Sequence, residues 1–161
     1  MNFYQFETPL GLMALGEEEG IIVRLYLPND GVPRLMSRPT PLLAEAERQL
    51  LEYFNGTRTS FDLPLNPLGT PFQHKVWAAL QAIPYGQTRS YKDLALAVDC
   101  PRGFQAVGQA NSRNPIPILI PCHRVVAADG SIGGYRGGPE MKQALLALEG
   151  QKFFAAPLAN S

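Results

Sequence analysis

The sequence predicts an α+β protein, with a small antiparallel sheet and one helix in its N-terminal part and a mainly helical C-terminal part. Two observations support this fold class. Short apolar runs separated by turn residues come first, and longer segments with helical spacing of apolar residues follow. A stretch stiffened by Pro64 and Pro67 separates the two patterns. We therefore expect a scaffold domain at residues 1–62, a linker at 63–69 and a second domain at 70–161.

The N-terminal part reads as a scaffold. Three short strands are predicted between turn-forming sequences, at residues 2–7, 10–15 and 20–26. A helix should begin after Thr40, which has the character of an N-cap, with Pro41 in the first turn. Apolar residues recur at helical spacing until Asn55-Gly56 ends the helix. No residue pattern in this part indicates chemistry.

Four helices are predicted in the C-terminal part, starting at Pro71, Tyr91, Arg102 and Pro139. The middle two are short, lie in a basic region and are joined by a tight turn, which is typical of a helix-turn-helix. The second of them, residues 102–112, is rich in small side chains, and Gly108 costs about 1 kcal/mol relative to alanine. Small residues allow close approach, either to a neighbouring helix or to DNA.

Residues 118–126 form an apolar run, predicted to be a buried strand, that is interrupted by Pro121, Cys122, His123 and Arg124. Burying these polar groups is costly unless they are paired. A cysteine attacks as its thiolate and needs a base, and the base needs an orienting group. His123 is the adjacent base. Glu149 ends the last helix beside its negative pole, a position that suits a partnered carboxylate.

Two points about this stretch stay open at the level of sequence. Neighbouring residues on a strand point to opposite faces, so Cys122 and His123 would need a bridging water or a turn at Pro121. The alternative is a buried structural cysteine beside a surface histidine.

The composition is that of a folded globular protein, with 45% hydrophobic and 17% charged residues among 161. No apolar run has the length of a membrane span, and residues 1–7 lack the pattern of a signal peptide. These features predict a cytoplasmic protein, in which Cys100 and Cys122 are free because thiols stay reduced there. Without a Cys-x-x-Cys pair, and with only two histidines, we expect no metal and no cofactor.

Charge is distributed unevenly although the formal net charge is zero. Residues 1–70 contain five Arg and nine Asp or Glu, a net of −4, whereas residues 71–142 contain eight Lys or Arg and four Asp or Glu, a net of +4. The basic half could meet a polyanion. The alternative is two ordinary surfaces that differ in charge.

Pro121-Cys122-His123-Arg124-Val125 resembles the active-site signature of the O6-alkylguanine-DNA alkyltransferases, also called methylated-DNA–protein-cysteine methyltransferases. The resemblance covers roughly residues 72–150. Besides the signature it includes residues 86–91, 106–108, 114–120, 133–135 and 145–150. The zinc-binding residues that some members carry in their N-terminal halves are missing. The resemblance implies a ribonuclease H-like N-terminal domain, followed by a helical domain with a helix-turn-helix and the active-site cysteine.

What the resemblance implies for activity is DNA repair by direct alkyl transfer from O6-alkylguanine, and less readily from O4-alkylthymine. Cys122 would accept the alkyl group irreversibly, so that each molecule acts once. His123 would draw the thiol proton through a water, with Glu149 orienting the imidazole. Tyr91 would donate a proton or hydrogen bond to the departing guanine, and Asn114 would bridge the second short helix and the active-site strand.

The implied partner is double-stranded DNA containing alkylated guanine, bound by a monomer without any role for a membrane. The family inserts its second short helix into the minor groove and flips the damaged nucleotide out. The residues expected to contact DNA or the base are Arg102, Gln105, Ala106, Gly108, Ala110, Arg113, Arg124, Val125, Tyr135 and Arg136. Arg89 and Lys92 are further candidates for phosphate contacts.

One position departs from the family pattern. Gln105 stands where members typically have an arginine that fills the gap left by the flipped base. A glutamine is shorter and uncharged, although its amide can still form hydrogen bonds with an unpaired base. Our hypothesis is that flipping is assisted less strongly here, or that Arg102 or Arg113 helps.

Three other functions compete with alkyl transfer. The first is a relative of the same fold that binds and flags alkylated bases without repairing them. The others are a thiol hydrolase with a Cys-His relay and a helix-turn-helix regulator without chemistry. Cys122 counts against the first and the last, and a hydrolase would turn over repeatedly.

Overall fold

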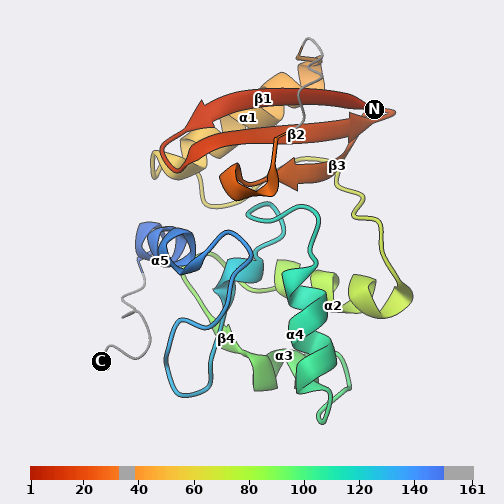
Figure 1. The fold of residues 1–161 in the computed structure, drawn as a ribbon, viewed down its shortest axis with the longest axis vertical. Helices are drawn as coiled ribbons and strands as arrows, with labels where there is room; N and C mark the ends of the chain where they lie inside the picture. Colours follow the sequence, from red (N-terminus) through yellow and green to blue (C-terminus); the bar gives the residue numbers. More distant parts are fainter. Residues whose placement is uncertain (33–38, 151–161) are drawn as a thin grey trace. The chain divides into compact units, whose positions relative to one another are not determined.

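The computed structural model describes residues 1–32 and 39–150, which form two compact units (Figure 1). The first unit contains Met1–Leu68 and Pro115–Leu119, and the second contains Gly69–Asn114 and the chain from Ile120 onward. Residues 151–161 of the predicted second domain lie outside the described residues. The predicted domain boundaries stay a prediction, because a compact unit need not fold independently.

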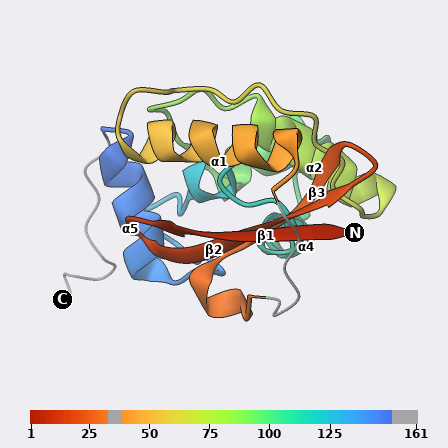
Figure 2. The ribbon, with the colours of Figure 1, turned by 90° about the horizontal axis from the view of Figure 1, so that it is seen from above.

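The first unit is built on a three-stranded antiparallel sheet of order β1-β2-β3. Its strands are β1 (Asn2–Thr8), β2 (Gly11–Glu18) and β3 (Ile21–Tyr26). Helix α1 (Pro41–Phe54) runs along one face of this sheet (Figures 1 and 2). Thr40 caps the helix by accepting a hydrogen bond from the Leu43 N–H. The three predicted strands and the predicted helix are therefore confirmed, and no strand end is shifted by more than three residues.

Two stretches from elsewhere in the chain bind the outer edge of β3. Ile22 donates its N–H to the Pro64 carbonyl at 2.9 Å, and its own carbonyl accepts from Asn66 at 2.9 Å. Leu25 donates to the Pro115 carbonyl, also at 2.9 Å. These bonds cover an edge that would otherwise expose unpaired backbone groups. They also attach the chain that leads toward Cys122 to the first unit.

The second unit is mainly helical. Its helices are α2 (Pro71–Gln81), α3 (Tyr91–Ala97), α4 (Phe104–Ser112) and α5 (Pro139–Leu148). The four predicted helices are confirmed, although α4 begins at Phe104 rather than at Arg102. The pair α3 and α4 has the predicted short connection, in which Asp99 adopts a left-handed φ of 57°. Two residues of β4 (Arg89–Ser90) pair in parallel with β5 (Val125–Val126).

The predicted strand over residues 118–126 is wrong except at Val125–Val126. Ile118 has a left-handed φ of 73°, which no β-strand accommodates. Cys122–Arg124 form a short 3₁₀ helix, η2. Apolar composition indicated burial correctly, since Ile118 and Ile120 are almost fully buried. It could not distinguish a buried strand from a buried turn.

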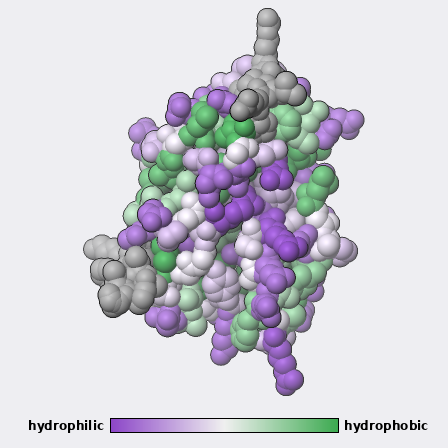
Figure 3. Space-filling view, viewed as in Figure 1, coloured by the Kyte–Doolittle hydropathy of each residue, from purple (hydrophilic) through white to green (hydrophobic). Residues whose placement is uncertain are grey.

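The described helices include none that is long and apolar enough to cross a membrane. On the face seen in Figure 3, hydrophobic residues occur in small groups among hydrophilic ones.

Trp77 holds α4 against α2. Its indole Nε1 donates to the Ala110 carbonyl at 2.9 Å, and the residue is only 2% exposed. The ring lies so close to Gly69 that a Cβ atom there would come within 2.4 Å of Cη2. Because α4 is the second helix of the helix-turn-helix, Trp77 sets the position of that pair within the second unit.

We predict that Trp77→Phe lowers the free energy of unfolding by about 1–2 kcal/mol, because it deletes a buried hydrogen bond while keeping an aromatic ring. Denaturant unfolding monitored by circular dichroism measures the change. Tyr4→Phe is the control, since it deletes the hydrogen bond from the Tyr4 hydroxyl to Glu47 where water can replace it. Equal losses in the two variants would contradict the anchoring role of Trp77.

Candidate active site

A tight turn at Pro121 places Cys122. Pro121 has φ −80° and ψ 65°, and the Cys122 N–H donates to the Ile120 carbonyl at 2.8 Å. This geometry is an inverse γ-turn, for which the fixed φ of proline is well suited. The 3₁₀ helix η2 follows at once, so Cys122 and His123 do not alternate across a strand. Of the two solutions that the sequence left open, the structure contains the turn.

Three buried side chains behind Cys122 form one network. His123 Nε2 lies 2.8 Å from Glu149 Oε2. Arg124 donates to both oxygens of the same carboxylate, from Nε to Oε1 at 2.8 Å and from Nη2 to Oε2 at 3.0 Å. Its third nitrogen, Nη1, donates to the Ile83 carbonyl at 2.8 Å. The two-point Arg–carboxylate contact is the strong form of a charge-assisted hydrogen bond.

The network defines the protonation of His123. Complete burial lowers the pKa of its imidazole, and the hydrogen bond with Glu149 only partly offsets that effect. The ring is therefore neutral near pH 7. Glu149 accepts a hydrogen bond from Nε2–H, so the other nitrogen, Nδ1, carries the lone pair. Nδ1 is buried and has no hydrogen-bond partner among the residues that the structure describes.

The environment of the Cys122 thiol pulls its pKa in two directions. Burial raises the pKa and dominates, because the residue is only 5% exposed. A hydrogen bond with Asn114 and the positive charges of Arg136 and Lys142 act in the opposite sense. Asn114 is itself fixed, because its Nδ2 donates to the Ile120 carbonyl at 2.7 Å. The thiol is thus protonated at rest and surrounded by groups that favour its anion.

The pairing of β4 with β5 brings Tyr91 to the cysteine. Arg89 lies opposite Val125 and Ser90 opposite Val126, and Tyr91 is the first residue of α3 directly after β4. Burial raises the pKa of the Tyr91 phenol, and the charge of the Cys122 thiolate raises it further. The phenol therefore keeps its proton across the physiological pH range and can donate it.

A glycine-rich loop, residues 133–138, lies beside this tyrosine. Gly133 has a left-handed φ of 75°, and a Cβ atom there would lie 3.4 Å from both the Tyr91 hydroxyl and Lys142 Nζ. Any side chain would strain the backbone and crowd both groups.

Lys142 is a site residue that the sequence interpretation missed. It is fully buried on α5, and its Nζ donates to the carbonyls of Val125 at 2.5 Å and Gly134 at 3.0 Å. Burial lowers its pKa to about 8, although the nearby Cys122 raises it. The signal was present in the helical pattern, since Lys142 precedes the buried Leu145 and Leu146 by one turn and shares their face.

The predicted DNA-contacting residues around α4 fall into two groups. Arg102, Gln105, Ala106 and Arg113 are exposed, and a Cβ atom at Gly108 would meet only open space. Ala110 is 3% exposed and lies on the inward face of the helix. The sequence predicts that its small size permits close approach to DNA, but in the structure the residue is buried, and its carbonyl accepts the hydrogen bond from Trp77.

The remaining predicted contacts lie nearer to Cys122. Arg124 is only 7% exposed and uses its guanidinium on Glu149 and Ile83, so it presents no open face for DNA. Val125 is fully buried and its carbonyl accepts from Lys142. Tyr135 and Arg136 are half-buried in the glycine-rich loop, and Arg136 Nη1 donates to the Asn114 carbonyl at 2.9 Å.

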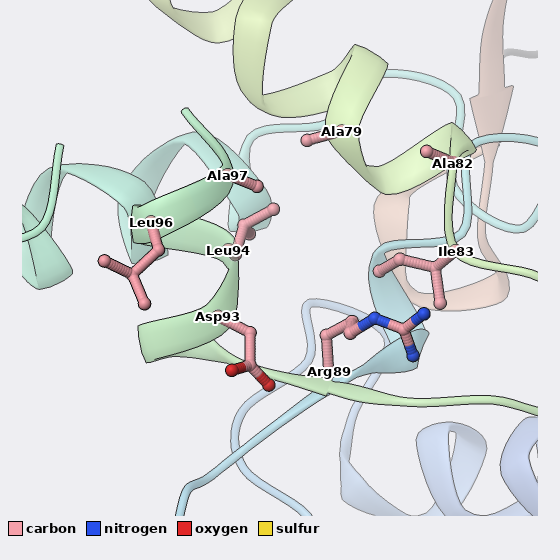
Figure 4. Close-up of a pocket in the computed structure, with 8 residues that line it drawn as sticks. All are labelled: Ala79, Ala82, Ile83, Arg89, Asp93, Leu94, Leu96 and Ala97. Carbon is pink, nitrogen blue, oxygen red and sulfur yellow. The ribbon is translucent and has the colours of Figure 1, made fainter. Parts of the chain in front are cut away.

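A separate groove of about 860 Å³ lies between α2 and α3 (Figure 4). Its lining is Ala79, Ala82, Ile83, Arg89, Asp93, Leu94, Leu96 and Ala97. Ile83 and Arg89 were described above, but none of the side chains that act on the thiol, namely Asn114, Arg136 and Lys142, lines the groove, so we do not associate it with the cysteine. Within the described ranges, no cluster of three or more His, Cys, Asp or Glu side chains could hold a metal ion.

Two family models and several curated relatives match this chain. Residues 71–151 match the model described as "6-O-methylguanine DNA methyltransferase, DNA binding domain", and residues 2–67 match "6-O-methylguanine DNA methyltransferase, ribonuclease-like domain". The constitutive methylated-DNA–protein-cysteine methyltransferase of Bacillus subtilis is 49% identical over 92% of this chain and 96% of its own. The Methanosarcina barkeri protein of the same name is 45% identical over 92% and 97%.

A solved structure agrees as well. The crystal structure of Mycobacterium tuberculosis OGT in complex with DNA matches with a TM-score of 0.87 and 38% identity, over 98% of both chains. The predicted α+β class is thereby confirmed, with a ribonuclease-like first part and a helical second part.

We predict that Arg124→Met lowers the free energy of unfolding by about 3–5 kcal/mol, because it leaves the Glu149 carboxylate buried without its strongest partner. Chemical denaturation measures the loss. The free energy of unfolding of Arg124→Lys should lie between those of the wild type and Arg124→Met, since an ammonium keeps the charge but not the two-point geometry. The control is Arg48→Met, whose ion pairs with Glu45 and Glu52 are exposed and contribute little. A loss at Arg124 no larger than that at Arg48 would contradict the network.

Lys142 should leave a signature in the pH dependence of stability. Between about pH 8 and its unfolded value of 10.5, the unfolded chain holds the proton that the folded protein has released, so its contribution to stability rises with pH. Across this window the unfolding free energy of the wild type should gain roughly 3 kcal/mol relative to that of Lys142→Met. Denaturation curves at several pH values measure the difference. A constant difference would show that the lysine has an ordinary pKa.

Proposed function

The chain belongs to the 6-O-methylguanine DNA methyltransferase family, and on this premise we propose that Cys122 repairs O6-alkylguanine in duplex DNA by taking the alkyl group onto its own sulfur. The activity is that of a methylated-DNA–protein-cysteine methyltransferase, and DNA is its partner. The transfer is irreversible, since a thioether is a stable bond, so each molecule acts once.

The observation that carries the proposal is the neutral His123 beside Cys122. Its Nε2–H is committed to Glu149, which leaves the buried Nδ1 as a base for the thiol proton. A water between Sγ and Nδ1 would carry that proton, because the two residues share one tight turn. Glu149 holds the ring in the required tautomer and stabilises the imidazolium that forms, as the carboxylate of a catalytic triad does.

The bond changes follow from this arrangement. The sulfur of Cys122 attacks the alkyl carbon, the S–C bond forms as the C–O6 bond breaks, and the electron pair of that bond goes to guanine. Tyr91 delivers a proton to the departing base, which lowers the cost of expelling it. The proton taken by His123 restores Tyr91 through solvent, so no net charge accumulates. Arg136 and Lys142 stabilise the thiolate until it reacts, and Asn114 holds the sulfur through its hydrogen bond.

The damaged base must leave the DNA duplex to reach the buried sulfur of Cys122. Extrusion costs on the order of a few kcal/mol and is easiest for a damaged or mispaired base. We propose that the exposed face of α4, with Gln105, Ala106 and Gly108, enters the minor groove. Arg102 and Arg113 would hold the phosphates on either side without reading sequence. The glycine-rich loop with Tyr135 would form a wall of the base pocket.

We further propose that the protein acts as a monomer in the cytoplasm. A reducing compartment keeps Cys122 in the thiol form that the reaction requires. One protein molecule is consumed for each lesion, and the single cysteine site offers no step that needs a second copy.

The decisive experiment is to incubate the protein with duplex DNA carrying O6-methylguanine labelled in its methyl group. We expect one label per molecule, located on Cys122 by mass spectrometry of peptides. Cys122→Ala should take up none. Cys100→Ala is the matched control, because Cys100 is the other of the two cysteines and is also free. Label at another residue, or more than one equivalent of demethylated DNA, would overturn the proposal.

A further inference from the structure

Phe104 is an apolar side chain that the proposed mechanism has not used. It is 48% exposed, among the most exposed large hydrophobic residues in the part of the chain that the structure describes. It is the first residue of α4, after Gly103, which provides no side-chain cap. Aromatic rings usually contribute to cores, so an exposed one at the edge of a binding face invites an explanation.

The position of Phe104 relates it to the proposed DNA-binding face. Gln105 follows directly and lies about 100° further round the helix. Both residues are in the first turn, where no earlier turn covers them. Gly108 lies one turn beyond Phe104 on the same side, and the space around it is open, so the ring has room beside it. The buried face of α4, with Val107, Ala110 and Asn111, points away from this region.

The chemistry of base extrusion requires what Gln105 lacks. Flipping a nucleotide out of the duplex leaves the opposite base unpaired and the neighbouring base step unstacked. An amide can form hydrogen bonds with the unpaired base, but it offers little apolar surface to replace lost stacking. Proteins that open the minor groove commonly insert phenylalanine or another apolar side chain between base steps. An aromatic ring stacks on any base, so this contact carries no sequence preference.

We propose that Phe104 is an apolar wedge that inserts at the base step beside the extruded nucleotide, while Gln105 meets the unpaired base. The ring would leave water on binding DNA and would stabilise the open step rather than the closed duplex. The partner is therefore duplex DNA with a flippable nucleotide, approached from the minor groove. This inference rests on the proposed function and adds a residue for extrusion to it.

The test compares two alkyl donors on the same protein. Free O6-benzylguanine base needs no extrusion, whereas O6-methylguanine paired within a duplex does. The measured quantity is the ratio of the duplex transfer rate to the free-base rate, for the wild type, Phe104→Ala and Phe104→Trp. The matched control is Leu96→Ala, which removes an apolar side chain of similar exposure, 54%, from the neighbouring helix α3.

We expect Phe104→Ala to lower this ratio by about tenfold, the loss of one stacked aromatic. Phe104→Trp should retain the ratio, and Leu96→Ala should leave it unchanged. The loss should shrink when the target is mispaired, because less work is then needed to extrude it. An unchanged ratio in Phe104→Ala, or an equal fall in Leu96→Ala, would overturn the proposal that Phe104 inserts at the base step. If the wild type reacted with neither donor, the proposed function itself would be overturned.

Discussion

The buried carboxylate of Glu149 is the constraint on which the site depends. A carboxylate at the C-terminal end of a helix faces the negative pole of the helix dipole, and burial adds a desolvation cost. Glu149 tolerates both because Arg124 contacts each of its oxygens and His123 contacts one of them. Arg124 also binds the Ile83 carbonyl. The end of α5, the 3₁₀ turn η2 and the segment after α2 are thereby held by one charged pair, and Cys122 lies in that turn.

This structural network also determines the chemistry. Glu149 occupies Nε2 of His123, so only Nδ1 remains to accept a proton, and burial keeps the imidazole neutral. The negative charge of Glu149 raises the pKa of the imidazole, and the positive charge of Arg124 counteracts that effect. A neutral imidazole is the form that could accept the thiol proton in the proposed reaction. Arg124, which the sequence predicts to be a DNA contact, is instead bound to Glu149 and is a positioning residue.

Sequence patterns identified the elements, and the structure defined how the site is assembled from them. Strands β1 to β3 and helices α1 to α5 follow from turn residues, caps and apolar spacing, all of which act locally. The turn at Pro121 could not be predicted in this way, because an apolar run looks the same in a buried strand and in a buried turn. Ala110 and Gly108 are both small residues of one helix, yet Ala110 is buried and a side chain at Gly108 would meet open space. Lys142 was overlooked because a lysine on a helix is ordinarily assigned to the solvent side.

The opposing influences on Cys122 fit the proposed reaction, in which each molecule acts once. Burial dominates, so the free thiol stays protonated and resists unwanted alkylation or oxidation, both of which require the thiolate. The groups that favour the anion are already in place at Asn114, Arg136 and Lys142, and the base at Nδ1 is free to accept the proton. What the resting site lacks is a substrate that excludes bulk water and accepts a proton from Tyr91. If each molecule is consumed by its own reaction, as we propose, a nucleophile that is activated only when the alkylated guanine arrives avoids loss of the protein between lesions. On the proposed mechanism, selectivity then depends on extruding the alkylated guanine into the site, and so on α4 and the residues of its first turn.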